Sequence, residues 1–293
     1  MKTFIRRYQI GLFFLLTLFI GYYPWWGFGI MGFFAGGLSI AGVIVVALAG
    51  GRKGLKEVLQ RWLKWRVNWP WYAAALLVPA LVSFIAVCLH IILGGKMPSF
   101  GLFRATPALL LFFILALFDP SNGPVGEELF GLRGYAQPEL QKKMRPVFAA
   151  LIVGTFFGAW HFPEFFRPGS SQYAIGFGLY PVFILTEIAH SAFQAWIYNR
   201  SGGSSLVGGT LVHASFNFWS SVILIPVFTS TAELANLSSI MDRQLVVIWM
   251  VIMILLGSGL VIATKGKLGM KPADKQPESS SLAGKIHHEI VVR

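Results

Sequence analysis

Residues 123–135 read GPVGEELFGLRGY and place two adjacent carboxylates, Glu127 and Glu128, and the guanidinium of Arg133 in an otherwise apolar chain. In a bilayer, an ionisable residue costs roughly 2.5–3.5 kcal/mol on insertion scales, so it is normally buried against polar partners. We therefore expect polar side chains from other helices to surround this stretch. Later parts of the chain offer three candidates: His161, His213 and Asn217.

The composition is typical of a membrane protein. Of the 293 residues, 55% are hydrophobic and 12% are charged, whereas soluble domains have about 25% charged residues. The apolar runs are long and continuous, which predicts an all-α bundle of membrane helices and argues against a β-barrel. Cys88 is the only cysteine, so the sequence encodes neither a disulfide framework nor a cysteine zinc site.

Apolar windows predict about eight membrane spans. Residues 1–264 are expected to form one transmembrane domain, and residues 265–293 a disordered cytoplasmic tail. Residues 52–66 have one apolar and one basic helical face, which predicts an interfacial helix lying on anionic lipid. The expected spans are residues 8–24, 28–49, 71–93, 105–119 continuing after a break into 124–143, 147–165, 174–198, 204–227 and 244–264.

The basic residues indicate topology and not nucleic-acid binding. With the N-terminus in the cytoplasm, 20 of the 24 Lys and Arg residues fall in inner segments. An excess of this kind on one side follows the positive-inside rule, so both termini are expected in the cytoplasm. The four basic residues of the outer segments are Lys96, Arg104, Arg167 and Arg243.

A break in the fourth apolar stretch precedes the carboxylates. Residues 119–124 read DPSNGP, and the prolines are expected to end one helix and to begin another at Pro124. Glu127 and Glu128 would then lie just inside a helix start, where the helix dipole favours negative charge.

The spacing of the polar residues predicts that they meet. Glu128 and His161 are equally far in sequence from the basic turn at residues 142–146, so an antiparallel hairpin places both roughly 25 Å from that turn. A buried carboxylate facing a neutral imidazole is a plausible general-base pair for activating water. His213 and Asn217, one helical turn apart, can donate to an oxyanion. This set suits attack of water on an amide, without a covalent intermediate.

Structural roles are the alternative for each group. The glutamates could form an ion pair with Arg133, His161 could be a hydrogen-bonded core histidine, and His213 with Asn217 could join helices by hydrogen bonds. Glu187 and His190, three residues apart, are interpreted first as a buried pair bonded to each other, and otherwise as a proton pathway or half of a metal site.

Four motifs, in order, resemble those of the CPBP intramembrane proteases. This family includes the Rce1-like CAAX prenyl endopeptidases, or CAAX prenyl protease 2, and bacterial proteins once called Abi. The resemblance implies an eight-helix fold in a prokaryotic plasma membrane, metal-independent glutamic endopeptidase activity without a cofactor, and a peptide or protein substrate that can be lipidated. The motifs are Gly126-Glu127-Glu128, Arg133-Gly134-Tyr135, Phe157-Gly158-Ala159-Trp160-His161 and His213-Ala214-Ser215-Phe216-Asn217.

By motif matching within residues 120–217, the resemblance gives each residue a role. Glu127 and His161 would activate the water, Glu128 and Arg133 would orient the site, and His213 with Asn217 would bind the oxyanion. One spacing differs, because four residues separate Glu128 from Arg133 where the family usually has three. In a regular helix the extra residue turns Arg133 by about 100°. Either Gly131 permits a π-bulge, or Arg133 has lost its role.

Two other functional classes remain open. One is a membrane metalloenzyme with a site built from Glu128, His161, Glu187 and His190, although the chain lacks an HExxH motif. The other is a non-catalytic membrane partner or a transporter. Transporters usually contain structural repeats and paired broken helices, whereas this sequence has one evident break.

Overall fold

The computed structural model describes residues 2–97, 110–111, 113–115, 117–121, 123–224 and 241–270. These residues form helices and no strand, which confirms the all-α prediction. The α-helices are α1 (Lys2–Gly21), α2 (Tyr23–Phe28), α3 (Gly37–Trp62), α4 (Trp69–Ile92), α7 (Gly123–Glu128), α8 (Gln137–Gln141), α9 (Pro146–Trp160), α10 (Ser171–Ile175), α11 (Tyr180–Arg200), α12 (Val212–Leu224) and α15 (Arg243–Ala263). Two π-helices, η1 (Leu132–Ala136) and η4 (Leu206–Leu211), and two 3₁₀ helices, η2 (Phe162–Phe166) and η3 (Phe177–Leu179), lie between them.

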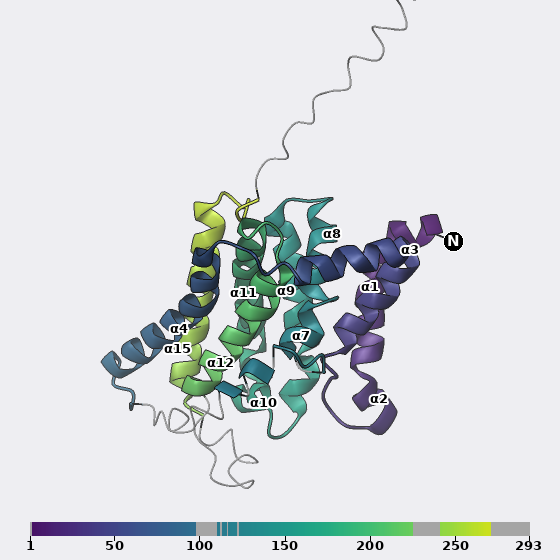
Figure 1. Cartoon of the computed structure of the whole chain (residues 1–293). Helices are drawn as coiled ribbons and strands as arrows, with labels where there is room; N and C mark the ends of the chain where they lie inside the picture. The colour runs from purple at the N-terminus through teal and green to yellow at the C-terminus, as the bar shows by residue number, and fades with distance from the viewer. Residues whose placement is uncertain are drawn as a thin grey trace, which may run out of the picture.

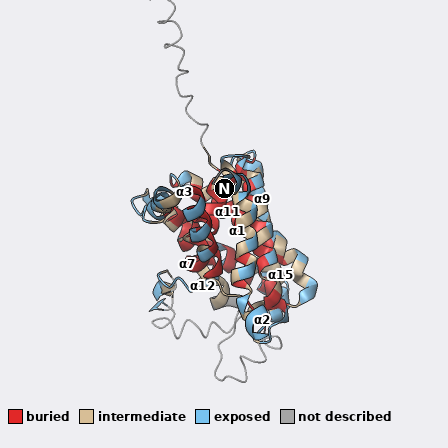
Figure 2. Cartoon of the chain, turned by 90° about the vertical axis from the view of Figure 1, so that its right-hand side faces the viewer, coloured by how far each residue is buried: buried red, intermediate tan, exposed pale blue. Residues whose placement is uncertain are grey.

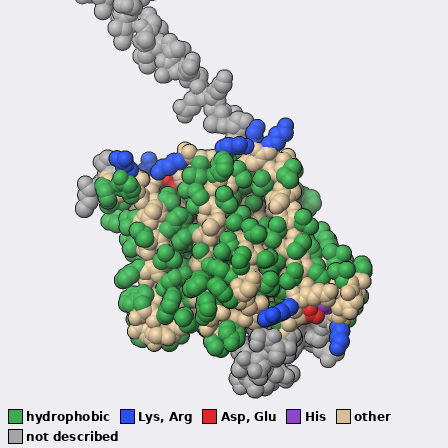
Figure 3. Space-filling view, turned by 180° about the vertical axis from the view of Figure 1, so that it is seen from behind, with side chains coloured by type: hydrophobic (Ala, Val, Ile, Leu, Met, Phe, Trp, Pro, Cys, Tyr) green, Lys and Arg blue, Asp and Glu red, His purple; other side chains and the backbone are tan. Residues whose placement is uncertain are grey.

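An apolar belt surrounds the bundle, so the chain is a multi-pass membrane protein (Figure 3). Large side chains point outward from several helices: Leu15 is 67% exposed, Phe84 64% and Leu255 65%. Exposed apolar surface on this scale is stable only against lipid or a partner. Five stretches among the described residues are long and apolar enough to cross a membrane: Phe4–Phe28, Gly37–Trp62, Trp69–Ile92, Pro146–Phe166 and Arg243–Ala263.

The predicted count of about eight spans goes beyond these five. The segment predicted at 124–143 is divided among α7, η1 and α8, and the one at 174–198 carries polar residues along α11. Residues 105–109 and 225–227 of two further predicted spans lie outside the described residues. The number eight therefore stays a prediction.

Small residues hold α11 between α9 and α15, at the centre of the bundle (Figure 1). A Cβ atom added to Gly154 of α9 would lie 2.5 Å from the Cα of Ile188, and one added to Gly257 of α15 would lie 2.6 Å from the Cα of Ala189. Glycine at such contacts lets helix backbones approach closely in a membrane. Buried residues consequently line the inward faces of the helices, while the outward faces are exposed (Figure 2).

The predicted interfacial helix is the second half of α3. Gly51 has φ 60° and ψ −153°, a conformation that glycine adopts most readily, and after this kink α3 runs across the end of the bundle (Figure 1). Its apolar face packs on protein as well as facing outward: Val58 is buried, and Trp62 Nε1 donates to Thr210 Oγ1 of η4 at 3.0 Å. The helix ends at Trp62, so residues 63–66 of the prediction are not helical.

The packed part of the chain extends past residue 264, where the sequence places the start of a disordered tail. Leu268 is fully buried against α9 and α11, and its carbonyl accepts from Asn199 Nδ2 at 2.9 Å. The amide of Val147 donates to the Gly266 carbonyl. Residues 265–270 therefore pack on the bundle, because an apolar side chain and backbone carbonyls of this segment find partners there, and the domain boundary predicted at 264/265 stays a prediction. The rest of the predicted tail, 271–293, lies outside the described residues.

Candidate active site

The glutamate stretch forms a short helix followed by a π-helix. Helix α7 begins at Gly123, close to the predicted start at Pro124, but ends at Glu128. The two carboxylates therefore lie in its last turn and not in its first, so the predicted stabilisation by the helix N-terminus is wrong. Gly131 interrupts the helix with φ −91° and ψ −111°, and a Cβ there would lie 2.1 Å from the carbonyl oxygen of Glu127.

The π-helix explains the extra residue between Glu128 and Arg133. In η1 the amide of Ala136 bonds to the carbonyl of Gly131, five residues earlier, and such a wider coil brings residues five apart onto one face. Arg133 Nη1 accordingly lies 3.2 Å from Glu128 Oε1, and its backbone amide donates to Glu128 Oε2 at 3.2 Å. The π-bulge that the spacing allowed is present, and Arg133 contacts Glu128.

Glu128 is fully buried and has several polar partners. Besides Arg133, the Gln194 amide of α11 donates to Glu128 Oε1 at 2.9 Å, and His213 Nδ1 lies 3.4 Å from the same oxygen. A buried carboxylate needs such compensation for its lost hydration. Glu128 thereby connects α7 to three other helical segments, η1, α11 and α12.

Glu127 faces a different environment. Its Oε2 lies 3.6 Å from His213 Nε2, on the side of the imidazole away from Glu128. His213 is the second residue of α12, which directly follows η4, the second π-helix. Gly209 in η4 allows the approach, since a Cβ there would lie 3.0 Å from Arg133 Cβ and 3.1 Å from Glu128 Oε2.

A cavity of about 380 Å³ opens beside these groups. Its polar wall is formed by side chains from four helical segments, and aromatic rings form much of the rest. Glu127 is on this wall, whereas Glu128 is not. The polar residues that line it include Glu127, His161, Glu187, His190, His213 and Asn217.

His161 and Asn217 lie on the cavity wall without directly contacting Glu127. His161 follows the last residue of α9, and its Nδ1 lies 2.9 Å from the Phe157 carbonyl. Because a carbonyl only accepts, Nδ1 carries the proton and Nε2 of the neutral ring keeps its lone pair. Glu127 and His161 share the cavity, as their matched heights predict, but the described side chains show no hydrogen bond or ion pair between them.

Helix α11 contributes residues that the sequence reading did not include in the site. Glu187 Oε2 lies 3.3 Å from His190 Nδ1, which confirms the predicted buried pair, and both residues line the cavity. His190 Nε2 is buried and has no hydrogen-bond partner. Glu187, His190 and Gln194 follow an i, i+3, i+7 pattern, which identifies one polar face on an otherwise apolar helix.

The cavity does not bring together the metal site considered from the sequence. Across the described ranges, no group of three or more His, Cys, Asp or Glu residues has the arrangement to hold a metal ion. Glu128, one of the four residues considered, is turned away from the cavity towards Arg133 and Gln194.

Comparison with known proteins points to the same residues. Residues 105–219 match the family described as Type II CAAX prenyl endopeptidase Rce1-like. This segment of the chain is Rce1-like. The chain is also similar to CAAX prenyl protease 2 of Methanococcus maripaludis, with 36% identity over 107 residues, and that match covers 34% of this chain and 36% of the relative. The chain thus matches about a third of that protein's length.

The Rce1-like segment includes most of the site. It contains α7, both π-helices and α11, and it ends within α12, two residues after Asn217. The family matched in the comparison and the family that the motifs resemble are the same. Helices α1, α3, α4 and α15 lie outside the matched segment and enclose it.

Proposed function

We propose that this protein is an intramembrane endopeptidase that uses Glu127 as the base for a water molecule and requires no metal. One observation carries the proposal: of two adjacent buried glutamates, Glu128 is fixed by Arg133 and Gln194, whereas Glu127 faces a cavity that His161 also lines. A carboxylate freed from a structural ion pair and placed beside a histidine can transfer protons. The Rce1-like match supports the same reaction class.

In the proposed first step, water in the cavity attacks the carbonyl carbon of a peptide bond. Glu127 takes a proton from the water, the new C–O bond forms, and the carbonyl π electrons move to its oxygen. His161 assists, because its Nε2 has a lone pair that can accept a hydrogen bond from the water. Glu128 and Arg133 position Glu127 indirectly, since both His213 and α7 are held by Glu128.

In the second step the tetrahedral intermediate collapses. Donors from His213 and Asn217 stabilise the oxyanion, which is the role that such donors have in acyl transfer. The C–N bond breaks, its electron pair goes to nitrogen, and the proton held by Glu127 passes to the leaving amine. The products are a carboxylic acid and an amine, and the proton that remains on the acid passes to the amine to give a carboxylate and an ammonium group, so the reaction balances without a further reactant.

The position of the active-site cavity and the distribution of Lys and Arg residues on the bundle support a proposal for the side of the membrane from which the substrate comes. Helix α9 (Pro146–Trp160) is about 22 Å long at 1.5 Å per residue, and the Glu164–Arg167 ion pair follows His161 within two turns. The site therefore lies close to the end of the bundle where α4 ends and α15 begins (Figure 1), and Lys96 follows α4, Arg167 follows η2 and Arg243 begins α15. On the face drawn in Figure 3, most of the visible Lys and Arg side chains gather at the opposite end. By the positive-inside rule the crowded end is cytoplasmic, so the substrate is an extracytoplasmic or outer-leaflet peptide in a plasma membrane.

The test is cleavage of fluorogenic peptides by the purified protein in detergent, with Glu127→Gln as the variant and Glu139→Gln as the control. Glutamine keeps the size of the side chain but cannot take a proton, so we expect kcat to fall by about 10²–10⁴-fold. Glu139 lies in α8 and does not line the cavity, so its variant should retain activity. Activity that survives a chelator and disappears in Glu127→Gln supports the proposal; activity that a chelator abolishes supports the metalloenzyme alternative.

A further inference from the structure

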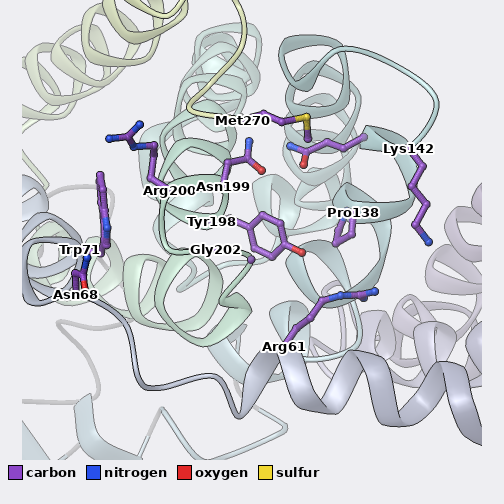
Figure 4. Close-up of a pocket in the computed structure, with 12 residues that line it drawn as sticks. Arg61, Asn68, Trp71, Pro138, Lys142, Tyr198, Asn199, Arg200, Gly202 and Met270 are labelled. Atoms are coloured by element: carbon purple, nitrogen blue, oxygen red, sulfur yellow. The ribbon is translucent and has the colours of Figure 1, made fainter. Parts of the chain in front are cut away.

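A second cavity, of about 660 Å³, lies at the Lys- and Arg-rich end of the bundle (Figure 4). The second half of α3, the start of α4, α8, and the end of α11 surround it, and Met270 closes one side. It shares no lining residue with the candidate active-site cavity. Neither the Rce1-like motifs nor the proposed reaction uses it.

The lining of this cavity is positively charged. Arg61, Lys142 and Arg200 are on its wall, and none of the lining residues is acidic. Arg61 donates one N–H to the Gly134 carbonyl at 2.9 Å, which leaves four of its five donors. The Arg200 guanidinium lies 5.5 Å from the centre of the Trp71 ring, and Lys142 pairs with Glu139, which is outside the lining.

A neutral donor lies on the same wall. Gln141 lines the cavity, and its buried Nε2 has no hydrogen-bond partner among the residues that the structure describes. A buried donor in this state carries an uncompensated desolvation cost. An acceptor oxygen bound in the cavity would remove that cost while neutralising the cations around it.

We propose that this cavity binds the phosphate of an anionic phospholipid. Two arginines without a carboxylate partner on the wall, a lysine shared with one glutamate outside it and an unsatisfied amide select a group rich in acceptor oxygens. The face drawn in Figure 3 is apolar up to the Lys- and Arg-rich end of the bundle, so acyl chains can lie along the apolar surface while the headgroup enters the cavity. Basic pockets between membrane helices on the cytoplasmic side recognise anionic headgroups by this arrangement.

Residues that line this second cavity contact both π-helices, η1 and η4. Arg61 bonds to Gly134 in η1. Tyr198, also on the wall, packs against η4, since a Cβ on Gly208 would lie 2.5 Å from the Tyr198 Cα. A bound headgroup therefore stabilises the segments that carry Arg133 and precede His213.

The test measures lipid binding to the full-length protein by native mass spectrometry and by thermal unfolding in neutral detergent. Phosphatidylglycerol is titrated beside phosphatidylcholine, and inorganic phosphate is added in a separate arm. We expect phosphatidylglycerol to bind and to raise the unfolding temperature, with an apparent affinity that falls about fivefold in Arg200→Gln and in Lys142→Gln. Lys143→Gln is the matched control, because Lys143 is exposed, adjacent to Lys142 and not on the wall.

Three results would overturn the assignment. Equal stabilisation by phosphatidylcholine would mean that no headgroup is recognised. An equal loss of affinity in Lys143→Gln would mean that anionic lipid is attracted in general to the Lys- and Arg-rich end of the bundle and not to this cavity. Full protection by inorganic phosphate alone would make the ligand a soluble phosphate and not a lipid. These results do not depend on peptidase activity, so the proposal can fail while the proposed function holds.

Discussion

At the scale of single residues, the site gives two neighbouring glutamates different surroundings. Glu128 is enclosed by Arg133, Gln194 and His213, while Glu127 borders the cavity. The local sequence cannot distinguish them, because both lie in the last turn of one short helix. Their difference comes from the residues of α11 and η1 that reach one carboxylate and not the other.

The buried pair of Arg133 and Glu128 gives a stability prediction. Arg133 is 1% exposed, and removing one partner of a buried ion pair leaves an uncompensated charge at a cost of about 3–5 kcal/mol. Arg133→Met should therefore lower the unfolding temperature strongly, as measured by thermal unfolding in detergent. Lys142→Met is the control, because the Lys142 side chain is 60% exposed in its pair with Glu139, which also accepts from Gln9, and such surface pairs contribute about 0–1 kcal/mol. Similar losses in both variants would contradict a structural role specific to Arg133.

At the scale of helices and turns, two π-helices shape the site. Helix η1 accommodates the residue that separates this chain from the usual motif spacing, and η4 ends directly before α12, whose second residue is His213. Glycine makes both possible by allowing close backbone contacts: a Cβ on Gly134 would lie 1.8 Å from the Leu129 carbonyl oxygen. π-Helices are often found at functional sites, and here they place Arg133 and His213 on the same side as the glutamates.

Gly134 gives a prediction for the π-helix. In Gly134→Ala the added methyl group would overlap the Leu129 carbonyl, so η1 must shift and the contact between Arg133 and Glu128 must change. We expect a lower unfolding temperature and at least a tenfold loss of kcat/KM, measured by thermal unfolding and peptide cleavage. Gly259→Ala in α15 is the control, since nothing lies within 4 Å of its added Cβ, and it should stabilise the helix slightly, by up to about 1 kcal/mol. An unchanged Gly134→Ala variant would show that η1 does not hold the site.

At the scale of the whole molecule, the Lys- and Arg-rich end of the bundle is opposite the end near which the candidate active-site cavity lies. The N-terminal half of α1, the turn before α9 and the end of α15 all lie at the basic end (Figure 1), where Arg6 of α1 donates to the Ala49 carbonyl of α3 and Arg145 donates to the Lys265 carbonyl. The candidate active-site cavity lies near the other end, with Gln172 on its wall. In the proposed reaction, the orientation of the bundle therefore decides which compartment supplies the substrate.

Cysteine labelling can determine this orientation, because Cys88 is the only cysteine. In a Cys88→Ala background, Gln172→Cys places a thiol at the active-site cavity, and Lys143→Cys places one in the turn between α8 and α9 at the basic end. A membrane-impermeant maleimide applied to intact cells should label the first and not the second, and permeabilisation should expose both. The reverse pattern would put the cavity on the cytoplasmic side and make a cytoplasmic lipidated peptide the better substrate candidate.

The sequence by itself determined the class of the protein and most of the residues in the site. Its continuous apolar runs exclude a soluble fold, and the cost of a charge in lipid requires that Glu127, Glu128 and Arg133 find partners. The tertiary structure decided which partners they find. Helix α7 ends at the glutamates, η1 turns Arg133 back towards Glu128, and α11 brings Gln194, Glu187 and His190 to the site. These contacts join residues up to 66 positions apart, and local periodicity carries no information about packing between helices so far apart in the chain.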